Sequence, residues 1–330
     1  MPSRLLICAL ALLAACDDPG GGNDYVEQLV VYGRISAGST SPDTVFVSRT
    51  SALDEPFEND NRWVSAALVT LSGGGQTVTL DPVAGRPGRY IDQGAQSLTI
   101  EPGATYTLTV EFEGDRLTAS ATVPDSLAIA SIGSTAFICG NAIDTVVAIN
   151  LYLEDNDPLG VESAAETRDW TGLSMDTVLY REGPCYSASF LSTPLFIIQW
   201  VGDGSGGILR AYSQALDTVP GRAIIDSSFP AHAFKGHMAR DEEGNLYRSP
   251  LVTFNASSTD LRFSWLFFNY TGPHIISMEL TDENLPAYLE GDPLGQNPLI
   301  EPQGNIVGGK GLFYASVVKR FPVWVTRQTP

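Results

Sequence analysis

The most recognisable chemical pattern in this chain lies near its end, where glycines surround a lysine. Residues 304–311 read GNIVGGKG and fill the first seven positions of the phosphate-binding loop GxxxxGK[ST]. The eighth position should carry a hydroxyl group for Mg²⁺, but Gly311 stands there. The run Leu312–Val318 that follows predicts a strand where such a loop requires a helix. We therefore interpret these residues as a glycine-rich turn that binds no nucleotide.

Oxygen-bearing side chains form a second pattern in the middle of the chain. Asp155, Asp157 and Glu166 fall on ligand positions of a calcium-binding loop. Leu159 stands where the fifth position should donate an oxygen, and Pro158 stiffens a loop that must wrap around the ion. The alternative is an acidic turn after a strand. The three histidines show no HExxH or comparable zinc spacing.

Cysteine chemistry dominates the first residues. A basic start and the short apolar run Leu5–Leu12 lead into Leu13-Ala14-Ala15-Cys16, which is typical of a secretory signal peptide. The last four residues resemble the bacterial lipobox. In such proteins the cysteine sulfur receives a diacylglycerol, the chain is cut just before the cysteine, and the new amino terminus is acylated. We predict a signal peptide over residues 1–15 and a lipidated Cys16 with a flexible tether over residues 16–27. The alternative is an ordinary secreted protein.

Two further cysteines remain in the mature chain. Cys139 and Cys185 would lie in a compartment that permits disulfides, and no Cys-x-x-Cys spacing favours a metal. A bridge between them would close a long loop, which the chain-entropy formula values at about 4 kcal/mol. We predict this disulfide. Two buried thiols and a metal pair are the alternatives.

Composition and charge limit the classes of partner. The chain has 330 residues, 43% of them hydrophobic, and a formal net charge of −19. Such a charge opposes nucleic-acid binding, which requires cations against phosphates, and argues against direct attachment to an anionic lipid surface. After removal of the signal peptide no apolar run is long enough to span a bilayer, so lipid is the expected anchor. We expect no cofactor.

The elements that must position these residues are mostly strands. Residues 28–124 contain short β-prone runs separated by turn signals, and several runs alternate polar with apolar side chains. Seven or eight such strands predict an immunoglobulin-like β-sandwich. Pro124-Asp125 marks the expected boundary.

Residues 125–330 predict a second, mainly-β domain with one or two short helices. The expected strands are Val146–Leu153, Leu195–Val201, Leu261–Asn269 and Leu312–Val318. The expected helices are Gly160–Trp170 and Leu280–Leu289, the second capped by Thr281. Two domains are also what the length of the mature chain favours.

Several of these segments resemble a known family. They are the lipobox, the run Leu29–Ile35, the run Gly103–Leu108, the dipeptide Asp157-Pro158 and the tail Pro302–Phe313. Together they resemble uncharacterised envelope lipoproteins of Bacteroidota-type bacteria, known only as a domain of unknown function. The chain departs from the family's tail, because Gly308-Gly309 stands where an Asn-Gly pair is usual.

The resemblance implies a role beside an uptake receptor, because genes of this family commonly lie next to those of TonB-dependent outer-membrane receptors. It supplies no catalytic residues. We therefore expect a non-enzymatic outer-membrane lipoprotein, facing the periplasm or the cell surface, that is accessory to such a receptor through ligand binding or docking. A surface adhesion or structural lipoprotein is one alternative, and a hydrolase whose site is not visible in the sequence is another.

A repeated tripeptide is a candidate site for covalent modification. Asp-Thr-Val resembles the acceptor for O-glycosylation of exported proteins in Bacteroidota-type bacteria. The alternative is that Asp ends a turn and Thr-Val begins a strand. The acceptor hydroxyls would be those of Thr44, Thr145, Thr177, Thr218 and, in the related Asp-Ser-Leu, Ser126.

The anchor generates the first testable prediction. Cys16→Ser should abolish lipidation and release the protein from membranes, because the sequence offers no other anchor. Membrane fractionation followed by a high-salt wash measures this. A variant that still sediments with the outer membrane after the wash would contradict the prediction.

Overall fold

The computed structural model shows a mainly-β protein, as the sequence predicts. It describes residues 25–39, 43–51, 62–94, 98–125, 127–134, 136–139, 142–145, 157–181, 196–201, 207–218, 248–249, 251–255, 260–263, 268, 270–290 and 302–328. In this part of the chain the structure has two short helices, and neither is long and apolar enough to cross a membrane.

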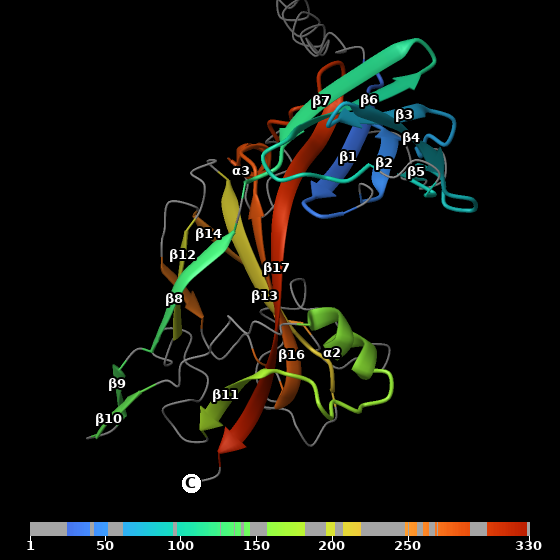
Figure 1. The fold of residues 1–330 in the computed structure, drawn as a ribbon. Helices are drawn as coiled ribbons and strands as arrows, with labels where there is room; N and C mark the ends of the chain where they lie inside the picture. The colour runs from blue at the N-terminus through green and yellow to red at the C-terminus, as the bar shows by residue number, and fades with distance from the viewer. Residues whose placement is uncertain are drawn as a thin grey trace, which may run out of the picture.

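Most strands belong to one large sheet (Figure 1). The strands of this sheet lie side by side in the order β14-β13-β16-β17-β1-β2-β5-β4-β3-β6-β7, and β11 also pairs with β17. The bounds are β1 Leu29–Ser36, β2 Val45–Arg49, β3 Leu68–Gly73, β4 Gln76–Pro82, β5 Arg89–Ile91, β6 Thr105–Phe112, β7 Asp115–Thr122, β11 Asp176–Arg181, β13 Ile208–Ala215, β14 Val252–Asn255, β16 Gly272–Thr281 and β17 Lys310–Gln328.

Two smaller sheets lie outside this path. One contains β8 (Ala128–Ser134), β12 (Phe196–Val201) and β15 (Asp260–Phe263), and the other pairs β9 (Ala136–Cys139) with β10 (Ala142–Thr145). β12 matches the strand predicted at residues 195–201, whereas the strand predicted at 146–153 lies outside the described residues.

Strands β1 to β7 surround one hydrophobic core. Each buries alternate side chains, as period-two patterning requires; β6, for example, buries Tyr106, Leu108 and Val110. The same core contains Phe313 and Ala315, which come from the far end of the chain. The tail expected to belong to the second domain therefore completes the core of the first region.

β17 joins the two regions because three strands pair with it. Its first residues pair in parallel with β1, from Val30 opposite Lys310 onward, and its last residues pair in parallel with β11. β16 pairs with the other edge of β17 in antiparallel fashion. Figure 1 shows β17 running from the lobe of β1–β7 to the lobe that contains β11 and α2.

The residues just before β17 pair with β7, which is the last strand in the order of this sheet. Val307 and Thr118 of β7 form an antiparallel bridge, with N–H···O distances of 2.8 and 3.0 Å in the two directions. The path of paired strands runs from β17 through β1, β2, β5, β4, β3 and β6 to β7. Through this bridge, its last strand pairs with the residues just before β17. The bridge protects the edge of β7 at this point.

Glycine is required where this tail crosses the sheet. Gly311 has φ +115°, and a Cβ there would lie 1.9 Å from the carbonyl oxygen of Val31. A Cβ on Gly309 would lie 2.6 Å from the carbonyl oxygen of Leu29. Backbone atoms cannot move aside as side chains do, so the glycine-rich run is a close crossing over β1 and β7. Lys310 begins a strand here, and a phosphate-binding loop would need a helix.

Polar side chains fix the same crossing. The amide group of Asn305 donates to the carbonyl oxygens of Phe313 (2.7 Å) and Ser120 (3.0 Å), and its Oδ1 accepts from the N–H of Phe313 (2.9 Å). Asn284 also donates to Ser120 (3.0 Å) and Phe313 (3.3 Å). Two asparagines thus satisfy backbone groups that no strand partner reaches in the described part of the chain.

A charged group ties the sheet together across β16 and β17. Glu279 of β16, with only 11% of its side chain exposed, accepts from Arg34 of β1 (3.3 Å) and from Arg210 of β13 (3.1 Å). Arg210 also donates to the hydroxyl of Tyr314 (3.1 Å). This buried carboxylate is paired and hydrogen-bonded, which is the condition for tolerating its burial.

Both helices are shorter than predicted. α2 covers Pro158–Ala164 and α3 covers Asn284–Leu289, against the predicted ranges 160–170 and 280–289. Residues 165–168 form turns. Thr281 is not a cap, because it ends β16, and the cap position of α3 belongs to Glu283 without a side-chain hydrogen bond. Pro286 is tolerated because it stands in the first turn, where its missing N–H costs nothing.

The crossing generates a stability prediction. Gly311→Ala should lower the free energy of unfolding by about 2–4 kcal/mol, because its Cβ meets backbone and its φ is left-handed. Thermal or denaturant unfolding measures the change, and the neighbouring Lys310→Ala, which shortens a side chain without adding a Cβ at the crossing, is the matched control. Equal midpoints for both variants would contradict the interpretation.

Candidate functional site

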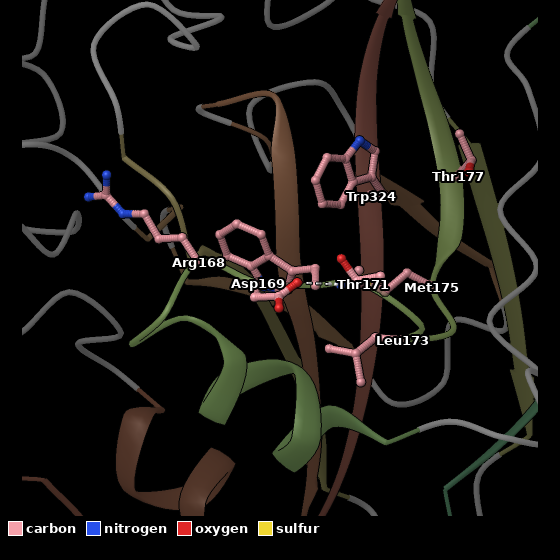
Figure 2. A pocket seen from close by; sticks show the side chains of 8 residues that line it. Arg168, Asp169, Thr171, Leu173, Met175, Thr177 and Trp324 are labelled. Carbon is pink, nitrogen blue, oxygen red and sulfur yellow. Dashed lines mark hydrogen bonds between the residues drawn. The ribbon is translucent and has the colours of Figure 1, made fainter.

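The candidate site is an open cleft of about 550 Å³ at the lobe of β11 (Figure 2). It is formed by the turns after α2, the start of β11 and the last part of β17. The described residues that line it are Arg168, Asp169, Trp170, Thr171, Leu173, Met175, Thr177 and Trp324. Among them only Thr177 was predicted from the sequence to be a candidate site residue, as an acceptor for O-glycosylation.

Local signals in the sequence shape the first wall. Pro158 stands at the start of α2, and the Asp157 side chain accepts a hydrogen bond from the N–H of Gly160 (2.9 Å). After α2 ends, Arg168 adopts φ +55°, which is uncommon for a residue other than glycine. The Asp169 carboxylate then accepts a hydrogen bond from the N–H of Thr171 (3.1 Å), which Figure 2 shows as a dashed line. This hydrogen bond is typical of a turn that begins at Asp.

Two indole rings provide the main apolar surface of the cleft. Trp170 and Trp324 meet edge to face, with ring centroids 6.0 Å apart and planes at 73°. The pairing of β11 with β17 sets this contact, since Thr177 stands opposite Trp324 in the register. Edge-to-face pairs are a favourable arrangement of aromatic rings, so the wall is preformed rather than assembled by a ligand.

Charged and polar groups also line the cleft. In Figure 2 Arg168 extends away from the other labelled side chains, while Leu173 and Met175 lie near Thr171. Hydrogen bonds from Thr171 lower the pKa of Asp169, which stays ionised at neutral pH. Beside the cleft, burial raises the pKa of Asp176 to about 6. The site thus combines an aromatic wall with one carboxylate, one guanidinium group and two hydroxyls, which suits binding of a ligand with both apolar and polar faces.

A second cavity of about 510 Å³ lies where the two regions meet. Its lining includes Ser120 and Thr122 of β7, Pro124, and Asp282 and Asn284. The carboxylate of Asp282 accepts from the N–H of Ala315 (3.1 Å) and from the N–H (3.2 Å) and amide (3.0 Å) of Asn284. It therefore holds the start of α3 against β17.

Burial governs the protonation of Asp282. Its side chain is almost entirely buried, and the loss of water raises its pKa to about 7 although the hydrogen bonds from Ala315 and Asn284 oppose the shift. This carboxylate therefore has a structural role at the junction.

The structure describes some of the residues that the sequence predicted as metal ligands, glycosylation sites, lipidation site or disulfide partners, and others lie outside it. Asp157 caps α2, and Glu166 is exposed after the helix. The structure does not bring three or more His, Cys, Asp or Glu side chains together as metal ligands among the described residues. Thr44 and Thr218 are half-buried, while Thr177 is exposed at the cleft. Asp155, Ser126, Cys16 and Cys185 lie outside the described residues, and Cys139 and Thr145 are described for their backbone alone.

A comparison with models of protein families gives a match over the first half of the chain. A family model described as Domain of unknown function (DUF4249) matches residues 20–188, which is 169 of the 330 residues. The match covers the described strands from β1 to β11 and the first wall of the cleft. A search of curated proteins found no match.

Asp282 generates a prediction about pH. Its pKa is about 7 in the folded protein and 3.8 ordinarily, so the folded state holds the proton more tightly than the unfolded state. Stability should therefore fall as pH rises from about 4 to about 7 and then level off. Asp282→Asn should remove this component, so the difference between wild type and variant should change by up to about 1.4 kcal/mol per pH unit in that range.

Denaturant unfolding at several pH values measures this difference. Asp169→Asn is the control, because the pKa of Asp169 is shifted downward and its side chain is exposed. Parallel pH profiles for wild type and Asp282→Asn would show that the junction carboxylate does not titrate in this window.

Proposed function

The chain belongs to this family of unknown function, DUF4249. We propose that it is a non-enzymatic, lipid-anchored binding protein of the outer membrane. In this proposal Cys16 carries the lipid and the Trp170–Trp324 cleft holds a ligand for a neighbouring TonB-dependent receptor. The resemblance of residues 13–16 to a lipobox supports the anchor, and the lining of the cleft supports the binding role.

The position of the cleft carries the proposal. Residue 25 stands just before β1, which pairs with the first residues of β17, while Trp324 stands near the other end of β17. Fourteen residues of strand separate Lys310 from Trp324, and at about 3.3 Å per residue they span about 45 Å. A protein anchored through its amino terminus would thus present the cleft far from its point of attachment, where a ligand or a receptor loop can reach it.

The lining of the cleft favours binding over covalent chemistry as its proposed role. Trp170 and Trp324 offer apolar ring surface, and Asp169, Thr171 and Thr177 offer hydrogen-bonding groups near them. Ligand sites of proteins typically combine a mostly apolar wall with a few placed polar groups. The hydrogen bond from the N–H of Thr171 holds the Asp169 carboxylate in place before a ligand arrives, which lowers the cost of ordering it.

The test begins with the receptor. We expect the lipidated protein, cross-linked in cells and purified from outer membranes, to retain a TonB-dependent barrel. The Cys16→Ser variant should lose it, since the tether keeps the protein near the barrel. Recovery of the lipidated protein with no barrel would contradict the accessory role.

The cleft is tested separately by uptake. Trp324→Ala should reduce receptor-dependent growth on the transported substrate at least tenfold, because it removes one ring of the aromatic wall. Leu159→Ala is the matched control, because Leu159 is 67% exposed on α2 and does not line the cleft. Equal growth of the two variants would place the ligand elsewhere.

A further inference from the structure

The outer side of β2 carries aromatic side chains rather than the polar ones that usually face water. Val45 and Val47 of this strand are fully buried in the core, so the alternate residues Phe46 and Ser48, and Thr50 after the strand, face the other side. Tyr32 of β1 stands opposite Phe46, and Trp63 stands opposite Ser48.

These side chains form one connected surface. The ring of Phe46 lies 6.5 Å from that of Tyr32 and 6.4 Å from that of Trp63, measured between centroids. The Arg89 guanidinium covers Phe46 at 5.4 Å. Tyr25 joins them through a hydrogen bond of 2.6 Å between its hydroxyl and that of Thr50. We name Tyr25, Tyr32, Phe46, Trp63 and Arg89 the aromatic face.

Much of this surface is open to solvent. Tyr25 is 45% exposed, Tyr32 42% and Trp63 39%, and Arg89 is exposed beside them. Exposed apolar surface that gathers on one face marks an interaction surface rather than ordinary scatter. The rings are held by one another and by the strands, so the face is rigid before any partner binds.

Chain length decides which partner is near. Tyr25 is the ninth residue after Cys16, and nine residues span at most about 32 Å when fully extended. With an acylated Cys16 in the bilayer, Tyr25 must stay within that distance of the membrane, and the rest of the aromatic face lies on the strands beside it. The tether also raises the effective concentration of membrane surface for this face, so that a weak contact suffices.

We propose that the aromatic face rests on the membrane surface and holds the molecule in a fixed orientation. Tyrosine and tryptophan favour the membrane–water interface, where the ring meets acyl chains and the polar atom meets headgroups. The net charge of −19 argues against an anionic lipid surface but not against a zwitterionic one, and the charged member of the face is the cation Arg89. The carboxylates of Glu27 and Glu113 bind Arg49, which belongs to the opposite side of β2. This inference rests on the proposed lipid anchor.

The experiment measures the depth of Trp63 directly. The Cys16→Ser protein, held through an amino-terminal histidine tag on vesicles that contain nickel-chelating lipid, makes the test independent of native lipidation. The phosphatidylcholine of the vesicles carries bromine on its acyl chains, which quenches tryptophans that enter the interface. We expect quenching of wild-type emission that is lost completely in Trp63→Phe and is at least halved in Tyr25→Ser.

Trp324→Phe is the matched control, because Trp324 lies at the far end of β17 and its removal should leave the quenched emission unchanged. Absence of quenching on bromine-labelled vesicles, or quenching that survives Trp63→Phe, would overturn the proposal. So would a cross-link from position 63 to the receptor barrel in place of lipid. A protein that is not lipidated in cells but shows Trp63-dependent quenching on the vesicles would refute the anchor and leave the membrane-binding face intact.

Discussion

The backbone hydrogen bonding of β17 is the constraint on which the rest of the structure depends. One edge pairs with β1 at its start and with β11 at its end, and the other edge pairs with β16. A nineteen-residue strand is far longer than the usual five or six residues. Its length is useful only because it serves both regions. Without it, the core of β1–β7 would lose Phe313 and the cleft would lose Trp324.

The entry to this strand is where the geometry is least tolerant. Gly309 and Gly311 pass so close to β1 that a methyl group would overlap its carbonyl oxygens. Asn284, Asn305 and Asp282 then satisfy the backbone groups of β7 and β17 that remain at the crossing. Buried polar networks of this kind stabilise one arrangement because every alternative leaves a donor or acceptor unpaired.

The two surfaces proposed for function lie at different ends of this framework. The aromatic face lies on β1 and β2, beside the point where the amino-terminal tether begins. The tryptophan cleft lies at the end of β17 that pairs with β11. If the first surface contacts lipid, a rigid sheet extends the second away from the bilayer. The buried Glu279, paired with arginines of β1 and β13, ties the neighbouring strands into that rigid unit.

The sequence by itself determined the mainly-β fold class and many of the strands. Alternating side chains predicted the strands of the first region because one face of each strand is buried, and Gly311 with the apolar run after it correctly predicted a strand in place of the helix that a phosphate-binding loop requires. Local rules failed at both helices, where tertiary pairing extended β16 through Thr281 and a turn ended α2 at Ala164.

Only the tertiary structure decided which distant residues meet. Trp170 and Trp324 share no sequence motif, and their spacing along the chain does not indicate a contact. They meet because the register between β11 and β17 brings them together. The same holds for Val307 and Thr118, and for the aromatic side chains on β1 and β2. Sequence periodicity reports which face of a strand is buried, but strand order and register depend on contacts between segments that no local pattern encodes.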